Sequence, residues 1–324
     1  MRLFFKLFLG FVFLICICIY FVVNPVLLKS DTFTSVIPVN SEFLRESVLN
    51  IAGYGNPRNF ENHDELNRCF DYISTQLKLY SDTSEVISFT ASGGSYRIFS
   101  GSVNCQASER IIVGAHYDVC GNTPGADDNA SAVAGLIELA RLFSLLKPEL
   151  KYRLDFVVFP LEEPPFFETD FMGSFIHARN MRDYKIDVKL MICLEMIGFF
   201  SDKAGSQKYP FSMMPLLYPD RGNFIALVGS LGEVSFVRRM KGVMNANSSV
   251  PVYSLNAPSF IPAISLSDHV NYWKFGFDAI MVTDTAYFRN PHYHKLSDTP
   301  ETLDYNRMAE VIRALYLAIL AIPD

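Results

Sequence analysis

The sequence predicts an α/β protein, a three-layer α/β/α sandwich around a central, mostly parallel mixed sheet. Short apolar runs rich in β-branched residues alternate along the chain with longer segments of helical periodicity. This alternation is typical of strands joined by helices that cross over the sheet. The chain has 324 residues, of which 50% are hydrophobic and 19% charged. Such a composition excludes a disordered protein and supports one well-packed core.

The first 28 residues differ from the rest of the chain. Arg2 and Lys6 precede an uncharged apolar run from Leu7 to Val23, and Asn24-Pro25 interrupts the run before residues 26–28 extend it. A helix that spans a bilayer needs about 20 apolar residues, and positive residues ahead of it favour a cytoplasmic N-terminus. We therefore expect a transmembrane signal-anchor over residues 1–28, a linker over 29–40 and one domain over 41–324.

This topology places the domain outside the cytoplasm, in a periplasmic or extracellular location. The alternative is a cleaved signal peptide, which would make the protein secreted. No small-x-small cleavage pattern lies near residues 22–30, so the sequence favours the anchor.

The domain is expected to begin with helices and a hairpin. Helical periodicity runs over Ser41–Ile51, with Ser41 as a cap, and over Glu61–Leu79. Two β-rich runs, Val86–Phe89 and Tyr96–Phe99, are separated by Ser92-Gly93-Gly94, which is typical of a hairpin turn.

The next segment, residues 110–146, is the one around which the other elements are arranged. The apolar run Arg110–Val113 indicates a buried strand, and Ala130–Leu146 has the spacing of a helix. Between them, Gly114–Asn129 reads G-A-H-Y-D-V-C-G-N-T-P-G-A-D-D-N. Ligands of open α/β sheets bind at such strand-to-helix loops.

The alternation continues to the C-terminus. We expect further strands at Tyr152–Phe159, Val188–Glu195, Phe224–Val228, Val250–Leu255 and Ala279–Thr283. We expect further helices at Phe171–Arg182, Leu231–Met244, Asp268–Phe275 and Glu301–Ile322. Two long loops, 161–170 and 196–221, follow strands that end near glutamates, and we expect them to form the walls of a pocket.

Acidic and imidazole side chains follow successive strands of the predicted sheet. They are His116, Asp128, the pair Glu162-Glu163, Glu195 and His294. If the strands are parallel neighbours, these side chains converge on one edge of the sheet. Three carboxylates and two imidazoles fit a pair of zinc ions, which take oxygen and nitrogen ligands and keep a position for water. The remaining carboxylate of the glutamate pair would be free to act as a general base.

These motifs resemble the co-catalytic zinc aminopeptidase family, which includes bacterial leucyl aminopeptidase and aminopeptidase Y. Glutaminyl cyclases and glutamate carboxypeptidases are related to it. The matching pieces are G-A-H-Y-D, P-G-A-D-D-N-A-S-A-V-A, L-E-E with G-S-F-I-H-A, E-M-I-G and Y-H-K-L-S-D-T, in the family's order between residues 110 and 305. The resemblance implies a zinc-peptidase, phosphorylase/hydrolase-like fold over residues 41–324. It also implies a zinc-dependent exopeptidase that hydrolyses the N-terminal peptide bond.

The resemblance further implies a metal-binding role for five residues. Asp128 would bridge both metals, and the peptide bond after it is typically cis in this family. His116 and Glu195 would complete one zinc site, while Glu163 and His294 would complete the other. Glu195 departs from the family, in which this position is usually Asp, so the second metal is the less firmly predicted one.

The resemblance assigns three more residues to the reaction. Glu162 would be the general base. Asp118 would hydrogen-bond His116 and fix its tautomer, and Asp268 is expected to support the ligands in a similar way. His63, His177 and His292 are interpreted as structural or solvated, since they lack acidic partners in a matching motif, and Asp127 as loop-forming.

Two alternatives to the aminopeptidase remain. A glutaminyl-peptide cyclotransferase of this family would use a single zinc and usually has Trp before the last ligand histidine, where this chain has Tyr293. A non-catalytic binding ectodomain of the same fold would lack a ligand or the base. In either enzyme the partner is a peptide or a small N-terminal amide.

Other function classes find little support in the sequence. The net charge of −6 is mild and no basic stretch occurs, which argues against nucleic-acid binding. No nucleophile elbow, Walker loop or dinucleotide fingerprint occurs either. The six cysteines have no C-x-x-C spacing, and Cys193, inside an apolar strand, is expected to be a free core residue.

Overall fold

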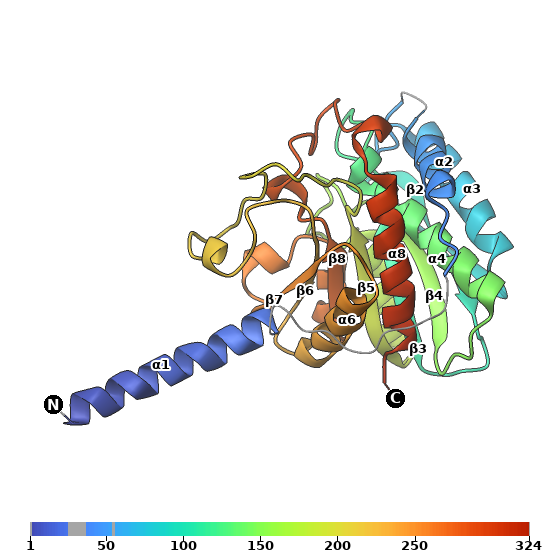
Figure 1. Cartoon of the computed structure of the whole chain (residues 1–324). Coiled ribbons are helices and arrows are strands. Elements are labelled where there is room, and N and C mark those ends of the chain that lie inside the picture. Colours follow the sequence, from blue (N-terminus) through green and yellow to red (C-terminus); the bar gives the residue numbers. More distant parts are fainter. Residues whose placement is uncertain (1, 25–36, 54–55, 324) are drawn as a thin grey trace.

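The computed structural model describes residues 2–24, 37–53 and 56–323, and Figure 1 shows the whole chain. In these residues eight strands form one mixed sheet in the order β1-β2-β4-β3-β5-β8-β6-β7. The strands are β1 (Thr83–Ala91), β2 (Gly94–Val103), β3 (Arg110–His116), β4 (Arg153–Phe159), β5 (Val188–Glu195), β6 (Ile225–Gly229), β7 (Val252–Asn256) and β8 (Ala279–Thr283).

The centre of the sheet is parallel and its two sides are not. Strands β4, β3, β5 and β8 are parallel neighbours, so their carboxyl ends share one edge. The β1–β2 hairpin adds to β4 in antiparallel fashion. On the other side, β6 and β7 are parallel to each other but antiparallel to β8.

Helices cover both faces of this sheet. One face packs against α2 (Ser41–Ala52), α3 (His63–Leu79), α4 (Ala132–Leu146), α6 (Val234–Ala246) and α8 (Tyr305–Leu320). The other face packs against α5 (Gly173–Asp183) and α7 (His269–Lys274). Three layers result, and the predicted fold class is confirmed.

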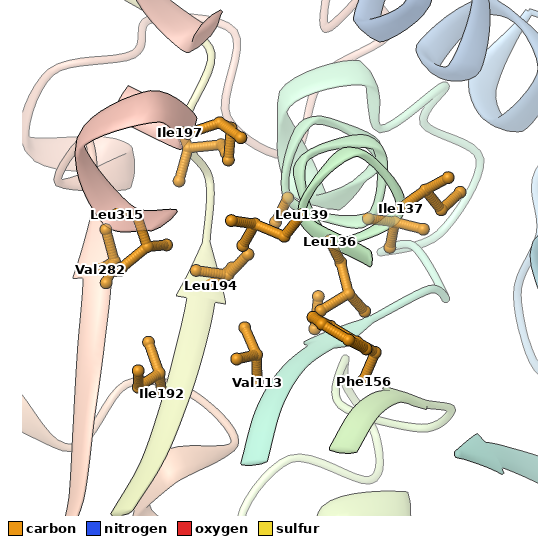
Figure 2. Close-up of a cluster of buried hydrophobic side chains, with 14 of the residues drawn as sticks. Val113, Leu136, Ile137, Leu139, Phe156, Ile192, Leu194, Ile197, Val282 and Leu315 are labelled. Carbon is orange, nitrogen blue, oxygen red and sulfur yellow. The ribbon is translucent and has the colours of Figure 1, made fainter. Parts of the chain in front are cut away.

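The larger core lies between α4 and the middle of the sheet. Figure 2 shows Leu136 and Leu139 of α4 above Val113, Ile192 and Leu194 of the central strands. All five side chains are fully buried. Burial of a leucine or isoleucine side chain stabilises the fold by roughly 1.5–3 kcal/mol, so this core holds the strand ends firmly in place.

Several element boundaries differ from those expected from the sequence. Strands β1 and β2 are longer than their apolar centres, because polar residues also pair in this hairpin. Asn40, rather than Ser41, caps α2 with its side-chain oxygen. The last helix begins at Tyr305 because the Asp304 side chain accepts the backbone N–H of Arg307, and a separate 3-10 turn precedes it.

A long N-terminal helix, α1 (Arg2–Val23), extends away from the sheet edge formed by β7 (Figure 1). Its 20 residues Phe4–Val23 are long and apolar enough to cross a membrane, and only 6% of that stretch is buried. A second stretch that passes the same test, Ala126–Leu146, is 78% buried and contains the core helix α4. Residues 1 and 25–28 of the expected anchor, and residues 29–36 of the expected linker, lie outside the described residues.

Candidate metal centre

The six predicted metal-binding and catalytic residues meet at the carboxyl edge of the parallel strands. His116 ends β3 and Glu195 ends β5, while Glu162 and Glu163 follow β4. His294 lies in the loop after β8. Every carboxylate of the group is buried, and His116 is fully buried. Strand direction thus explains why residues far apart in the sequence share one site.

Asp128 lies between the two histidines of the group. Its Oδ1 is 3.4 Å from His116 Nε2, and its Oδ2 is 3.1 Å from His294 Nε2. Each histidine has a second carboxylate beside it. Glu195 Oε2 lies 3.4 Å from His116 Nε2, and Glu163 Oε2 lies 3.2 Å from His294 Nε2. The cluster therefore has two halves that share one aspartate.

The donor set fits divalent metal ions. Both ring nitrogens of His116, Nε2 of His294 and Oε1 of Glu163 are buried without a hydrogen-bond partner among the described residues. Such groups are costly to bury unless something satisfies them. Ligand atoms of His116, Asp128 and Glu163 lie within 4.8 Å of one another. Imidazole nitrogens and carboxylate oxygens at this spacing are typical ligands of zinc.

The electrostatics of the cluster also favour a cation. Burial raises the pKa of Glu163 to about 8, and the nearby charge of Asp128 acts in the same direction. Burial alone would lower the pKa of His294, but the nearby carboxylates of Asp128 and Glu163 outweigh it and raise that pKa to about 10. Burial likewise raises the pKa of Glu162 well above its usual range. A bound cation would relieve this excess of buried negative charge.

Asp118 connects the first half of the cluster to the glutamate pair. Its Oδ1 lies 3.5 Å from His116 Nδ1. Its two oxygens also accept the backbone N–H groups of Glu162, at 3.2 Å, and Glu163, at 3.1 Å. The carboxylate thereby holds the backbone of both glutamates and lies beside the His116 ring.

Glu195 is held in place by residues from two other segments. Ser267 Oγ donates a hydrogen bond of 2.6 Å to Glu195 Oε2, and Asn129 Nδ2 lies 3.5 Å from the same oxygen. Asp268, next to Ser267, is fully buried and interacts electrostatically with His116 and Glu195. Burial raises its pKa to about 7. Sequence reasoning identified Asp268 but missed Ser267, although both stand in the same S-L-S-D-H motif.

The loop that carries Asp128 is held by buried groups at both ends. The Asp128–Asn129 peptide bond is cis. Asp298 accepts the backbone N–H groups of Asp127 and Asp128. At the other end, the fully buried Arg58 donates to the carbonyls of Tyr117, Pro124 and Gly125. Sequence reasoning missed Arg58, because its partners are backbone atoms and leave no motif.

A third residue that sequence reasoning missed is Cys120. Its sulfur lies within 4.8 Å of ligand atoms of Glu163 and His294. None of the six cysteines forms a disulfide in the described part of the chain. Cys193 is buried in the core, as expected.

The histidines interpreted as structural lie in other surroundings. His177 Nδ1 pairs with the Tyr272 hydroxyl in the core, at 2.7 Å, and His292 Nδ1 pairs with Ser297. Asp127 connects its loop to two other segments, because it accepts the backbone N–H of Gly198, after β5, and the side-chain amide of Asn290.

An apolar cavity opens beside the metal-binding cluster. It is lined by residues of β6, β7 and β8 on one side, and by Glu162, Glu163, Glu195 and His294 on the other. Both long loops expected to form pocket walls contribute side chains. Loop 161–170 provides Pro164 and Phe167, and loop 196–221 provides residues that include Tyr209, Met214 and Tyr218.

Comparison with known proteins supports the same interpretation of the chain. Residues 100–319 match the model of peptidase family M28. "Uncharacterized protein YfbL" of Escherichia coli (strain K12) is 43% identical over 281 residues, which cover 84% of this chain and 85% of that protein. A "Probable leucine aminopeptidase" of Arthroderma otae is 25% identical over 218 residues, or 62% of this chain, and the chain spans 50% of that protein's length.

Solved structures share the fold at low sequence identity. The LapA aminopeptidase of Legionella pneumophila aligns with a TM-score of 0.69 and 16% identity, over 92% of this chain and 79% of the other. The glutaminyl cyclase of Fimbriiglobus ruber aligns with a TM-score of 0.67 and 20% identity, over 91% of this chain and 98% of the other. Together with the family match, these likenesses lead to one conclusion: the chain belongs to peptidase family M28.

Proposed function

We propose that this protein is a zinc-dependent aminopeptidase that removes the N-terminal residue of peptides. The observation that supports this most is the position of Asp128, whose two oxygens face two histidines that each have a further carboxylate. Asp128 would bridge two zinc ions. His116 and Glu195 would complete one site, and Glu163 and His294 the other.

Glu162 is the proposed general base. Zinc bound in the cluster would acidify a water and polarise the carbonyl of the scissile bond. The Glu162 carboxylate, with Oε2 3.8 Å from His116 Nε2, is left over when the five ligands are assigned. It takes the proton of the attacking water and returns it to the leaving amine. Burial raises its pKa above the usual range, which favours acceptance of the proton.

The cavity supports an apolar N-terminal side chain in the substrate. Phe224, Val228 and Met281 line one side of it, and Tyr253 and Leu255 extend the apolar surface along β7. Among the described residues that line it, Lys208 is the only lysine or arginine. A pocket of this composition gains free energy mainly by covering apolar surface of the substrate.

The test uses the full chain, purified in detergent, and peptides that begin with Leu. Amino-acid release is followed for free and for acetylated N-termini, each with and without a zinc chelator. We expect release from the free peptides alone and its loss with the chelator. Chelator-insensitive release would contradict the zinc proposal. Cyclisation of peptides that begin with Gln, without hydrolysis, would instead assign the protein to the cyclases.

We also propose that α1 anchors the protein in a membrane with the M28 domain outside the cytoplasm. The length and apolar surface of Phe4–Val23 support a spanning helix, and Arg2 and Lys6 support a cytoplasmic N-terminus. The cleaved signal peptide is the competing possibility, and the intact mass of the mature protein separates the two.

A further inference from the structure

The end of α1 is attached to the domain through buried polar contacts. The fully buried Lys241 of α6 donates from Nζ to the carbonyl of Val23, at 2.6 Å, and to Ser254 Oγ of β7, at 2.8 Å. Ser254 Oγ donates to the same carbonyl at 3.0 Å. Asn24, also fully buried, donates from its side chain to Asn256.

These contacts fix the direction in which α1 leaves the domain. The last carbonyls of a helix have no partner within the helix, and the last turn of α1 contains no basic residue. Lys241 Nζ provides a hydrogen-bond donor for the last carbonyl at this end. Beside it, the Arg238 guanidinium lies 5.4 Å from the centre of the Tyr20 ring. The helix and the domain are thus joined by buried and surface contacts together.

A run of exposed apolar side chains lies in the loop 211–217, which reads F-S-M-M-P-L-L. Phe211 is 52% exposed, Met213 71% and Leu216 78%. The intervening Met214 faces the cavity, so the loop has one side toward the substrate pocket and one toward the outside. Exposed apolar groups gathered in this way mark contact surfaces for proteins or membranes.

The position of α1 decides between these two kinds of partner. In Figure 1 the loop with its short helix at Met214–Leu216 and the helix α1 project from the same side of the domain. A bilayer crossed by α1 therefore lies on the side to which the loop projects. Arg238 and Arg239, both exposed on α6 next to the end of α1, would face the same surface.

We propose that loop 211–217 and the exposed arginines of α6 form a membrane-binding face of the M28 domain. Phe211, Met213 and Leu216 enter the headgroup region of the bilayer that α1 spans, and Arg238 and Arg239 contact anionic headgroups. The wall of the cavity is then held at the membrane surface. This proposal rests on α1 as an anchor, and it is independent of the peptidase reaction.

Tryptophan fluorescence tests the proposal, because Trp273 is the only tryptophan of the sequence. The full chain with Phe211→Trp is reconstituted in vesicles of phosphatidylcholine and phosphatidylglycerol with brominated acyl chains, which quench nearby indoles. The matched control is Val86→Trp, since Val86 is 50% exposed and lies on β1, at the opposite edge of the sheet. After subtraction of the unsubstituted protein, we expect at least twofold more quenching for Phe211→Trp.

Equal quenching of the two variants would overturn the proposal. A Phe211→Trp signal that responds to protein concentration instead of brominated lipid would do the same and would assign the loop to a second copy of the chain. Adding Met213→Ser and Leu216→Ser to Phe211→Trp should reduce its quenching, because these changes weaken insertion. If the intact mass of the mature protein shows that α1 has been cleaved off, the proposal fails because its anchor is missing. That outcome does not depend on the result of the peptide assay.

Discussion

The Glu162 side chain is buried close to the carboxylates of Glu163 and Glu195. This environment favours a proton on Glu162, as the proposed general base requires. Replacement of Glu162 by Gln keeps the shape but removes the proton acceptor. We expect kcat to fall by about 10²–10⁴-fold, the usual contribution of general acid–base catalysis, with unchanged zinc content. Glu168→Gln, at an exposed position of the same loop, is the control. A rate like that of the unsubstituted protein would contradict the assignment of the base.

The resemblance implied Asp at the position of Glu195, and the structure shows what the extra methylene of Glu195 reaches. Its Oε2 accepts from Ser267 and lies 3.4 Å from His116 Nε2. Glu195→Asp would move the carboxylate oxygen away from both Ser267 Oγ and His116 Nε2. We expect zinc affinity at this half of the cluster to fall by roughly 10–100-fold, and Ser267→Ala to act in the same direction. Isothermal titration calorimetry with zinc measures the affinity of both variants. Tighter zinc binding by Glu195→Asp would show that the longer side chain is not adapted to this site.

The residues of the cluster could be predicted because the carboxyl ends of parallel strands meet at one edge. His116 and Glu195 needed only that rule and the positions of their strands. Ser267 and Arg58 could not be found in this way. They act through a single hydrogen bond or through backbone carbonyls, and such contacts depend on tertiary positions that no local pattern encodes.

At the level of the elements, Arg58 joins the segment before α3 to the loop between β3 and α4. Arg58→Met would leave three backbone carbonyls without their donor in a buried place. We expect the free energy of unfolding to fall by about 3 kcal/mol, in the range found when a buried charged partner is removed. Urea denaturation measures this, with the exposed Arg45→Met on α2 as the control. A loss below ~0.5 kcal/mol would show that water replaces the donor.

Most elements were predictable from periodicity, and the exceptions have local causes. The predicted bounds of β5 and β8 agree with the structure because apolar runs and strands coincide there. The start of α8 was wrong because Pro300 initiates a separate turn before Asp304 caps the helix. The antiparallel direction of β6 against β8 also left no signal, because strand direction depends on the connections rather than on the residues of a strand.

At the scale of the whole molecule, buried carboxyls make the stability of the metal-free protein depend on pH. Burial raises the pKa of Glu163 to about 8 and that of Asp298 to about 7. Between their usual values near 4 and these values, the folded state holds protons that the unfolded chain releases. The free energy of unfolding therefore falls as pH rises through this range.

The measurement is urea unfolding at pH 5.5, 6.5 and 7.5, with chelator or with added zinc. We expect the metal-free protein to lose at least ~1.4 kcal/mol across the range, the equivalent of one pKa unit. Zinc should reduce the loss, since a bound cation favours the ionised carboxylates. Parallel pH dependence of the two forms would show that the cluster does not bind the metal.

The cavity and the metal-binding cluster are built from different parts of the chain. His116 and Glu195 end core strands, whereas Tyr209, Met214 and Tyr218 belong to a surface loop that packs over the sheet. Substitutions or insertions in that loop can change which substrates fit, with little effect on the strands that position the reacting groups. During evolution, substrate selectivity can therefore change through this loop while the residues that carry out the reaction stay the same.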